Sequence, residues 1–209
     1  MISLQILCSG TPTPSEIRWG SAYALKMGDS WLMFDCGPAA TYKLIKSGIS
    51  PLNVSHLFFT HHHSDHDADY ACFLLSRFDM SIGKEPNLRV YGPPPTRTLT
   101  QKLIGEKEGA YWHDFVARTN HPLSLWAYQN RGGNLPRKIP VIHATDIESG
   151  ELINGPDWTV ECSRVEHVQP YLDSLAYRVN TNKGSIVFSG DTRPCQSLVE
   201  LAQGCDVLV

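Results

Sequence analysis

The chain has 209 residues, enough for one domain with a sizeable core, and its 42% hydrophobic and 19% charged residues exclude wholesale disorder. A net charge of −3 excludes bulk electrostatic attraction to nucleic acid, so contact with RNA would need a local basic patch. No apolar run approaches the length of a membrane span and the first residues lack a basic start, so we expect no membrane segment and no secretory signal. Six cysteines without a CxxC pair are typical of reduced thiols, which predicts a cytoplasmic protein.

The first third of the chain predicts strands that lead to polar loops. Residues 2–7 alternate as a strand, and 21–26 and 30–34 form a hairpin that ends at Asp35. In the intervening loop, the guanidinium of Arg18 is a candidate for binding a phosphate or sulfate group, because it pairs with such anions through two hydrogen bonds. A structural ion pair is an equally good interpretation of this arginine.

Two helices and a short strand follow. Residues 39–47 have helical spacing, and the helix should end at Gly48, because glycine commonly follows the last turn of a helix. Residues 56–60 are apolar and β-prone, which predicts a short buried strand. Residues 69–78 begin a second helix, with Asp67 or Asp69 as its N-cap.

A cluster of imidazoles and a carboxylate lies between this strand and this helix, in the stretch Thr60-His61-His62-His63-Ser64-Asp65-His66. His61 and His63 point the same way because they are two apart in nearly extended backbone, and the turn brings Asp65 and His66 round to them. Four nitrogen and oxygen ligands in six residues suit zinc or another first-row metal and exceed what one tetrahedral ion with an open position uses. The sequence therefore predicts two metal ions. An affinity tag is disfavoured, because a tag has no strand before it.

The middle of the chain is rich in aromatic residues. Residues 88–91 predict a strand and 96–104 a helix, and the whole segment 93–140 is interpreted as an insertion. Its Trp and Tyr side chains suit either a lid over the metal site or a contact with a second copy in a homodimer.

The second half of the chain predicts further strands and one helix. The expected strands are 140–143, 151–153, 158–162, 175–179 and 185–188, the last two forming a hairpin. Residues 196–203 predict a helix closed by Gly204. Residues 205–209 have the pattern of a buried strand, so we expect the protein to continue beyond them.

These polar clusters, in this order, resemble the metallo-β-lactamase superfamily. Thr60-His61-x-His63-x-Asp65-His66 is similar to its signature motif. Phe34-Asp35-Cys36-Gly37, Glu166-His167-Val168 and Ser189-Gly190-Asp191-Thr192 are similar to its first, third and fourth motifs. The resemblance implies an α/β fold, an αββα sandwich of two mixed sheets between helical layers, formed by a single domain over 1–209 whose C-terminal part is missing.

The resemblance also implies roles for the site residues. His61, His63 and His167 would hold a first divalent ion, and Asp65 and His66 a second, with Asp191 between the two. Zn²⁺ is the expected metal, with Mn²⁺ or Fe²⁺ as alternatives, and a bridging hydroxide is the expected nucleophile. Asp65 would steer the proton of the attacking water, and Asp35 would support a ligand histidine.

Two short stretches, one near the N-terminus and one after the second helix, narrow the resemblance. Cys8-Ser9-Gly10-Thr11-Pro12-x-Pro14 followed by Arg18, together with Val90-Tyr91-Gly92-Pro93, resembles the ribonuclease Z branch, which includes small phosphodiesterases and arylsulfatases. The implied function is a zinc phosphodiesterase or endonuclease that acts on RNA or a small anionic ester. An arylsulfatase, a lactonase or a non-catalytic metal-binding protein are the alternatives. A di-iron redox protein is disfavoured, because such members carry Glu where this chain has His63.

Two features depart from the family pattern. The superfamily's late histidine, which completes the second metal site, has no candidate, since His167 is the last histidine. His167 and Asp191 are 24 positions apart, which leaves room for two strands and a turn but not for the arm with which bacterial ribonuclease Z grips transfer RNA. The short spacing weakens the transfer-RNA interpretation.

Overall fold

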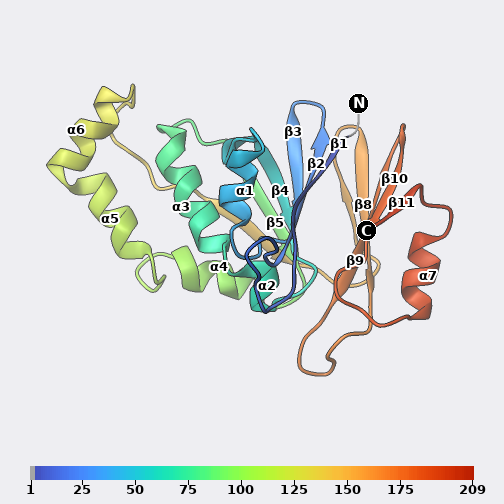
Figure 1. Cartoon of the computed structure of the whole chain (residues 1–209). Helices are drawn as coiled ribbons and strands as arrows, with labels where there is room; N and C mark the ends of the chain where they lie inside the picture. Colours follow the sequence, from blue (N-terminus) through green and yellow to red (C-terminus); the bar gives the residue numbers. More distant parts are fainter. Residues whose placement is uncertain (1–2) are drawn as a thin grey trace.

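Two β-sheets pack face to face in the structure, a computed structural model that describes residues 3–209 (Figure 1). The six-stranded sheet has the order β1-β2-β3-β4-β5-β6. Its strands are β1 (Ser3–Ser9), β2 (Ser21–Met27), β3 (Ser30–Phe34), β4 (Val54–Phe58), β5 (Leu88–Gly92) and β6 (Ile142–Asp146). The five-stranded sheet has the order β11-β10-β9-β8-β7. Its strands are β7 (Leu152–Asn154), β8 (Trp158–Arg164), β9 (Leu175–Thr181), β10 (Gly184–Phe188) and β11 (Val207–Leu208).

Helices cover the outer faces of both sheets, so the chain has the four layers of an αββα sandwich (Figure 1). The helices are α1 (Ala40–Lys46), α2 (Ser64–Asp67), α3 (Tyr70–Ser81), α4 (Thr96–Ile104), α5 (Trp112–Asn120), α6 (Pro122–Asn130) and α7 (Gln196–Ala202), with a short 3₁₀ turn at Pro51–Asn53. The expected fold is therefore confirmed. None of the helices within residues 3–209 combines the length and apolarity that crossing a membrane requires.

Strand β4 explains why the His-rich stretch is held firmly. It is buried on both faces, as expected for a strand in the parallel part of a sheet. Leu57 packs toward the helices and Phe58 into the core between the sheets. Phe58 stacks on Phe34 with ring centroids 5.1 Å apart, and Phe34 in turn stacks on Phe188 of the other sheet at 4.0 Å.

Parallel pairing brings the carboxyl ends of β3 and β4 to the same edge of the sheet. Phe34 pairs with Phe58 in the register of the two strands. The residues that follow each strand, Asp35 and Thr60, therefore lie side by side. This edge carries the polar residues that the sequence singled out.

Within the aromatic-rich segment, α4 lies against the six-stranded sheet, whereas α5 and α6 pack against the last turns of α3. The rings of Phe115 and Phe78 meet edge to face at 4.9 Å, and the guanidinium of Arg137 lies 4.2 Å from the Phe78 ring. Asp79 binds Arg118 at 2.9 Å. These contacts lie at the opposite end of α3 from α2, about 18 Å along a helix of this length. A lid over the metal site is therefore disfavoured, and a dimer contact stays a prediction.

Three local predictions differ from the structure. The strand expected at 140–143 begins later, at Ile142, which pairs with Leu88, because Pro140 has no N–H to donate. Asp69 occupies the expected N-cap position before α3, but its carboxylate makes no cap bond there; it accepts from Thr41 N at 2.6 Å and so caps α1 instead. Residues 207–208 form the expected strand and pair with β10, but within residues 3–209 they are 44% and 54% exposed and not buried.

Candidate metal centre

A buried carboxylate organises the edge where β3 and β4 end. Asp35 is 1% exposed and adopts a left-handed backbone with φ of 59°, which aspartate tolerates better than most residues. Its Oδ1 accepts from Thr60 N at 2.8 Å and its Oδ2 from Ser21 Oγ at 3.1 Å. The same Oδ2 lies 2.7 Å from His66 Nδ1. This contact fixes the His66 ring and leaves its Nε2 free to face the site.

The single turn α2 sits unusually close to the sheet because two glycines make room for it. A Cβ added at Gly20 would lie 2.4 Å from the carbonyl oxygen of Asp65, and one at Gly37 only 2.0 Å from it. Any side chain at either position would push Asp65 and His66 away. The sequence predicts a turn at these residues, and the structure forms a single helical turn there instead.

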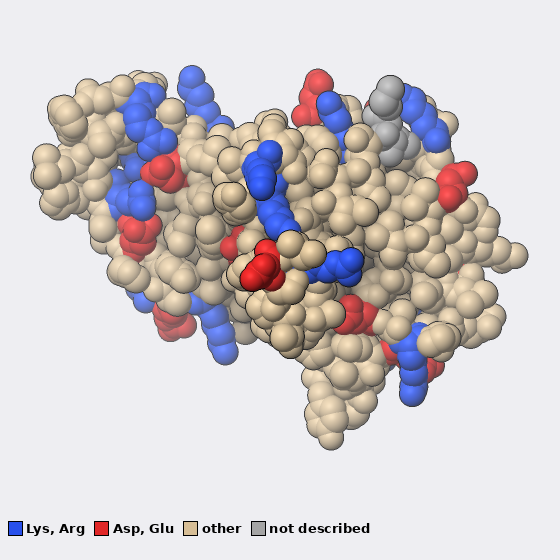
Figure 2. All heavy atoms as spheres, in the orientation of Figure 1, with Lys and Arg blue, Asp and Glu red and all other residues tan. Residues whose placement is uncertain are grey.

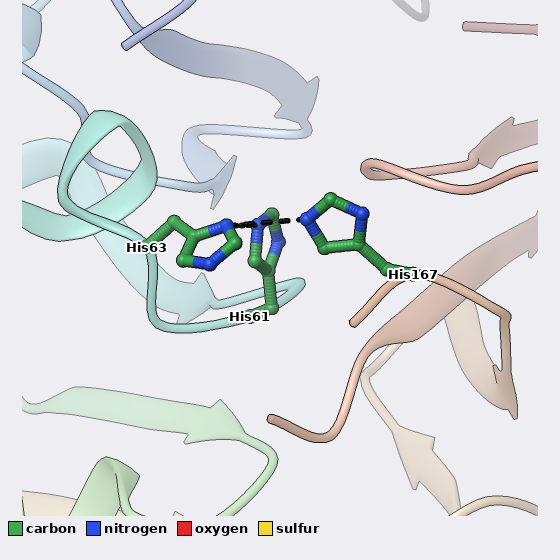
Figure 3. A group of neighbouring side chains, drawn as sticks. All are labelled: His61, His63 and His167. Atoms are coloured by element: carbon green, nitrogen blue, oxygen red, sulfur yellow. Dashed lines mark hydrogen bonds between the residues drawn. The ribbon is translucent and has the colours of Figure 1, made fainter. Parts of the chain in front are cut away.

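Three imidazoles from two distant segments meet in one cluster (Figure 3). His63 Nδ1 lies 3.1 Å from His61 Nε2 and 3.1 Å from His167 Nε2. His61 and His63 come from the stretch between β4 and α2, and His167 from the loop after β8. The structure thus brings together residues that are more than a hundred positions apart.

A second cluster shares His61 and adds His66 and Asp191, with the ligand atoms within 4.8 Å of one another. Asp191 Oδ1 lies 3.4 Å from His66 Nε2. Asp65 Oδ2 lies 3.6 Å from the same nitrogen, but Asp65 belongs to neither cluster within residues 3–209. His61 therefore lies between the two groups of donors.

The charges of the second cluster are strongly coupled. Burial and the neighbouring His66 lower the pKa of His61 to about 3, so this imidazole is neutral and has a free lone pair. Burial lowers the pKa of His66, but the carboxylates of Asp35 and Asp191 outweigh it and raise the pKa to about 10. The contact with His66 lowers the pKa of Asp191 to about 2. A cation bound by His66 Nε2 would replace this proton, as metal binding to histidine generally does.

The two loops that carry His167 and Asp191 are joined directly. The carbonyl oxygen of Glu166 accepts from Arg193 N at 2.9 Å and from Thr192 Oγ1 at 3.0 Å. The Glu166 carboxylate accepts from Arg193 Nε at 2.6 Å. Each of these residues is a direct or near neighbour of a candidate ligand, so the two loops are held as one unit.

The other predicted residues lie outside the clusters. Arg18 is exposed in the loop before β2, and its side chain forms no ion pair with residues 3–209. His62 points away and lies 3.1 Å from Asp67 Oδ2 and 2.7 Å from Thr96 Oγ1. His56 packs against Phe58 and Trp158. These contacts identify His56 and His62 as packing residues and not as members of the clusters.

Some residues of the site were not assigned a role from the sequence. Ser21 and Thr60 hold Asp35, and the Glu166–Arg193 pair joins the loops. The position of Thr60 and of Glu166, each directly before a candidate ligand histidine, is a signal that points to them. Nothing in the local sequence identifies Ser21 or Arg193, because their partners are remote along the chain.

The donor set fits divalent metal ions. For zinc–nitrogen bonds of about 2.0–2.1 Å, tetrahedral geometry separates two ligand nitrogens by about 3.3 Å, close to the observed 3.1 Å. Asp65 Oδ1 is buried without a hydrogen-bond partner. A buried carboxylate oxygen without a donor is costly, and a cation or a water bound to it would satisfy it.

The sequence profile of the "Metallo-beta-lactamase superfamily" matches residues 20–196, which include all of these candidate ligands. The chain belongs to the metallo-β-lactamase superfamily. Members of this family are metal-dependent hydrolases, and the histidine cluster agrees with binding of divalent metal by this chain.

Curated relatives match over the whole chain. A protein named ribonuclease Z from Mycobacterium sp. (strain KMS) is 29% identical over 209 residues, which cover 100% of this chain and 68% of the relative. A ribonuclease Z from Mycobacterium bovis (strain BCG / Pasteur 1173P2) is 27% identical over 215 residues, covering 100% and 69%. The resemblance to ribonuclease Z seen in the sequence is thus confirmed at the level of homologues.

Solved structures agree on the fold. The metallo-beta-lactamase fold protein YhfI from Bacillus subtilis superposes with a TM-score of 0.73 at 17% identity, covering 99% of this chain and 70% of YhfI. The short form of human tRNase Z has a TM-score of 0.65 at 19% identity, covering 100% and 76%. At these identities the similarity concerns the fold alone.

Proposed function

We propose that this protein is a binuclear zinc phosphodiesterase of the ribonuclease Z type. The main observation in support is the convergence of three imidazoles, His61, His63 and His167, beside a second donor group of His66 and Asp191. The ribonuclease Z relatives, which match over the full chain, support phosphodiester hydrolysis rather than sulfate or lactone hydrolysis.

His61, His63 and His167 would hold the first ion, and His66 with Asp65 the second, with Asp191 as a further ligand between the two. Zinc ions bound there supply Lewis-acid activation of water and neutralise charge on a phosphoryl oxygen. Asp35 keeps the Nε2 of His66 directed into the site through its bond to Nδ1.

Asp65 is the residue we assign to proton transfer. Its Oδ1 is buried and unpartnered, so this oxygen is available to accept a proton from an attacking water. The carbonyl oxygen of Asp65 packs closely against Gly20 and Gly37. This packing fixes the backbone that carries the carboxylate. A fixed base lowers the barrier because its orientation is set before the reaction.

RNA is one substrate candidate and a small phosphodiester is the other. On the face shown in Figure 2, Lys and Arg side chains are scattered among neutral surface instead of forming a continuous stripe. Between His167 and Asp191 the chain forms only the β9–β10 hairpin and its connecting loops, so a transfer-RNA arm is absent from this segment. Both observations favour a short or small phosphodiester over a long nucleic acid.

The test is metal content by mass spectrometry together with turnover of bis-p-nitrophenyl phosphate by wild type, Asp191→Ala and Asp157→Ala. Asp157 is an exposed carboxylate in the turn before β8 and serves as the matched control. We expect Asp191→Ala to lower kcat/KM on the order of a hundredfold or more and to lower the bound zinc, with no effect of Asp157→Ala. Unchanged turnover in Asp191→Ala overturns the proposal. Faster turnover of p-nitrophenyl sulfate or of a lactone would reassign the substrate class.

A cytoplasmic location and a homodimer complete the proposal. All six cysteines are free thiols, which supports a reducing compartment. The exposed Leu123 and Trp126 on α6, 70% and 64% accessible, support a contact between two copies.

A further inference from the structure

The loop between β8 and β9, residues 165–174, carries His167 and projects from the lower edge of the molecule in Figure 1. Its two legs are joined at the base. Val165 N donates to Ser174 O at 3.0 Å, and Arg164 forms an ion pair with Asp173. The projection is therefore closed at its base by the protein's own contacts.

The inside of the loop is also hydrogen-bonded. The side chain of Gln169 accepts from His167 N at 2.8 Å and donates to Val165 O at 2.8 Å. Tyr171 N donates to Val168 O at 3.1 Å, which closes a turn at the tip. A loop with this many internal bonds presents its tip in a defined orientation. Binding of a ligand at the tip therefore costs little further conformational entropy of the loop.

The side chain at this tip is an exposed aromatic ring. Tyr171 is 89% exposed, against 64% for Tyr42, the exposed tyrosine on α1 whose ring lies under the Lys46 ammonium. The space-filling view shows the lower projection as neutral surface (Figure 2). Nucleic-acid-binding proteins use exposed aromatic rings of this kind to stack on bases.

The short chain separation between Tyr171 and His167 is compatible with the size of a nucleotide. Tyr171 is four positions after His167, so the Cα atoms of the two residues are at most about 14 Å apart even if the chain between them is extended. A base attached one or two units from the reacting phosphate falls within that range.

The charges around the loop favour stacking over ionic attraction. Arg164 is paired with Asp173 and Arg193 with Glu166. The neighbouring arginines are thus balanced by carboxylates, and the ring is the distinguishing feature of the loop. We propose that Tyr171 stacks on a nucleobase of the substrate and makes the centre selective for nucleotide phosphodiesters over phosphodiesters without a base. This inference rests on the proposed phosphodiesterase function.

The experiment compares two esters with the same leaving group, thymidine 5′-(p-nitrophenyl phosphate) and methyl p-nitrophenyl phosphate, in the full-length chain loaded with zinc. We expect Tyr171→Ala to raise KM about tenfold for the thymidine ester and to leave the methyl ester unchanged. Tyr171→Phe should keep the wild-type KM for both, because the ring is retained. Tyr42→Ala is the matched control and should behave as wild type.

The outcomes separate the two proposals. An equal change on both esters, or no change on either, overturns the role of Tyr171 while phosphodiester turnover persists. If wild type hydrolyses neither ester, the proposed function is wrong and the stacking role is overturned with it. Zinc content measured on each variant shows whether His167 has been disturbed, and a loss of zinc in Tyr171→Ala would overturn a role in stacking alone.

Discussion

Two buried charged residues, one at each end of strand β4, carry out opposite tasks. Asp35, 1% exposed, binds Thr60 and Ser21 at the carboxyl end of the strand. Arg77, fully buried, binds the other end, where its guanidinium donates to Val54 O at 2.9 Å, to Pro86 O at 2.8 Å and to Pro51 O. Its Nε donates to Glu85 at 3.2 Å.

The two residues differ in whether their partners keep an atom free to bind a ligand. The contacts of Arg77 end within the scaffold, so this residue joins the 3₁₀ turn, β4 and the segment before β5. The contact of Asp35 with His66 instead leaves an imidazole nitrogen directed toward Asp191. Burial of a charge therefore does not identify a functional site by itself. The functional site is identified by a neighbouring side chain that still has an atom free to bind a ligand, here Nε2 of His66.

Metal removal should produce the largest effect. It tests whether the carboxyl end of β4, where Asp35 lies, is the end that carries the metal-dependent activity. We expect dialysis against a chelator to abolish phosphodiester hydrolysis, and added Zn²⁺ to restore it, because the donors at this end are arranged for cations. Far-ultraviolet circular dichroism should change little, since three apolar clusters hold the layers together. Full activity in protein with less than about a tenth of an equivalent of metal would contradict the assignment.

Arg77→Met should weaken the scaffold at the amino end of β4 without affecting activity. Removing the guanidinium leaves the partly buried Glu85 carboxylate and several buried carbonyls without donors, so we expect the free energy of unfolding in urea to fall by about 3–5 kcal/mol. Turnover per folded molecule should stay at the wild-type value. Arg97→Met, at an exposed position on α4, is the control and should leave stability within about 0.5 kcal/mol of wild type.

Asp35→Asn should show the reverse pattern. Asparagine keeps the size of the side chain and tolerates the left-handed backbone, but it no longer offers a carboxylate to His66. We expect kcat/KM and zinc affinity to fall about 10–100-fold, as for other residues that orient a metal ligand. Ser21→Ala removes one donor to Asp35 and should have a smaller effect on both. Wild-type zinc affinity in Asp35→Asn would refute the positioning role.

Asp69→Ala is expected to have the smallest effect. Asp69 precedes α3, the helix that also carries Arg77, so the two substitutions compare the start and a buried position of one helix. The carboxylate caps α1 by accepting from Thr41 N at 2.6 Å. Its loss should cost about 1 kcal/mol of stability, the usual value for an N-cap. Urea unfolding measures this cost, and Asp69→Asn should recover part of it. A loss of several kcal/mol would show that Asp69 has a further structural role.

The sequence predicted the parts of the site that follow from local chemistry. His61, His63, Asp65 and His66 lie within six residues after one apolar strand, and parallel pairing places Asp35 beside them. The positions of His167 and Asp191 came from the family resemblance, and the structure places both residues in the histidine clusters.

The remaining features depend on contacts between residues far apart in the sequence. Asp69 was expected to cap its own helix, but tertiary packing brings α1 closer to its carboxylate. The pattern of residues 205–209 predicted burial, yet exposure depends on which strands pair with β11. The location of α5 and α6 follows from Phe78, Asp79 and Arg137, whose contacts have no local signal.

The cross-link from Glu166 to Thr192 and Arg193 has an evolutionary consequence. It anchors His167 independently of the tip of the loop, residues 170–172, so the tip can change in length or sequence while the ligand stays in place. Lengthening a surface loop is thermodynamically cheap, about 0.6 kcal/mol for each doubling. The tip can therefore be lengthened without displacing His167, and a laboratory graft at this position should alter substrate range while the histidine clusters stay in place.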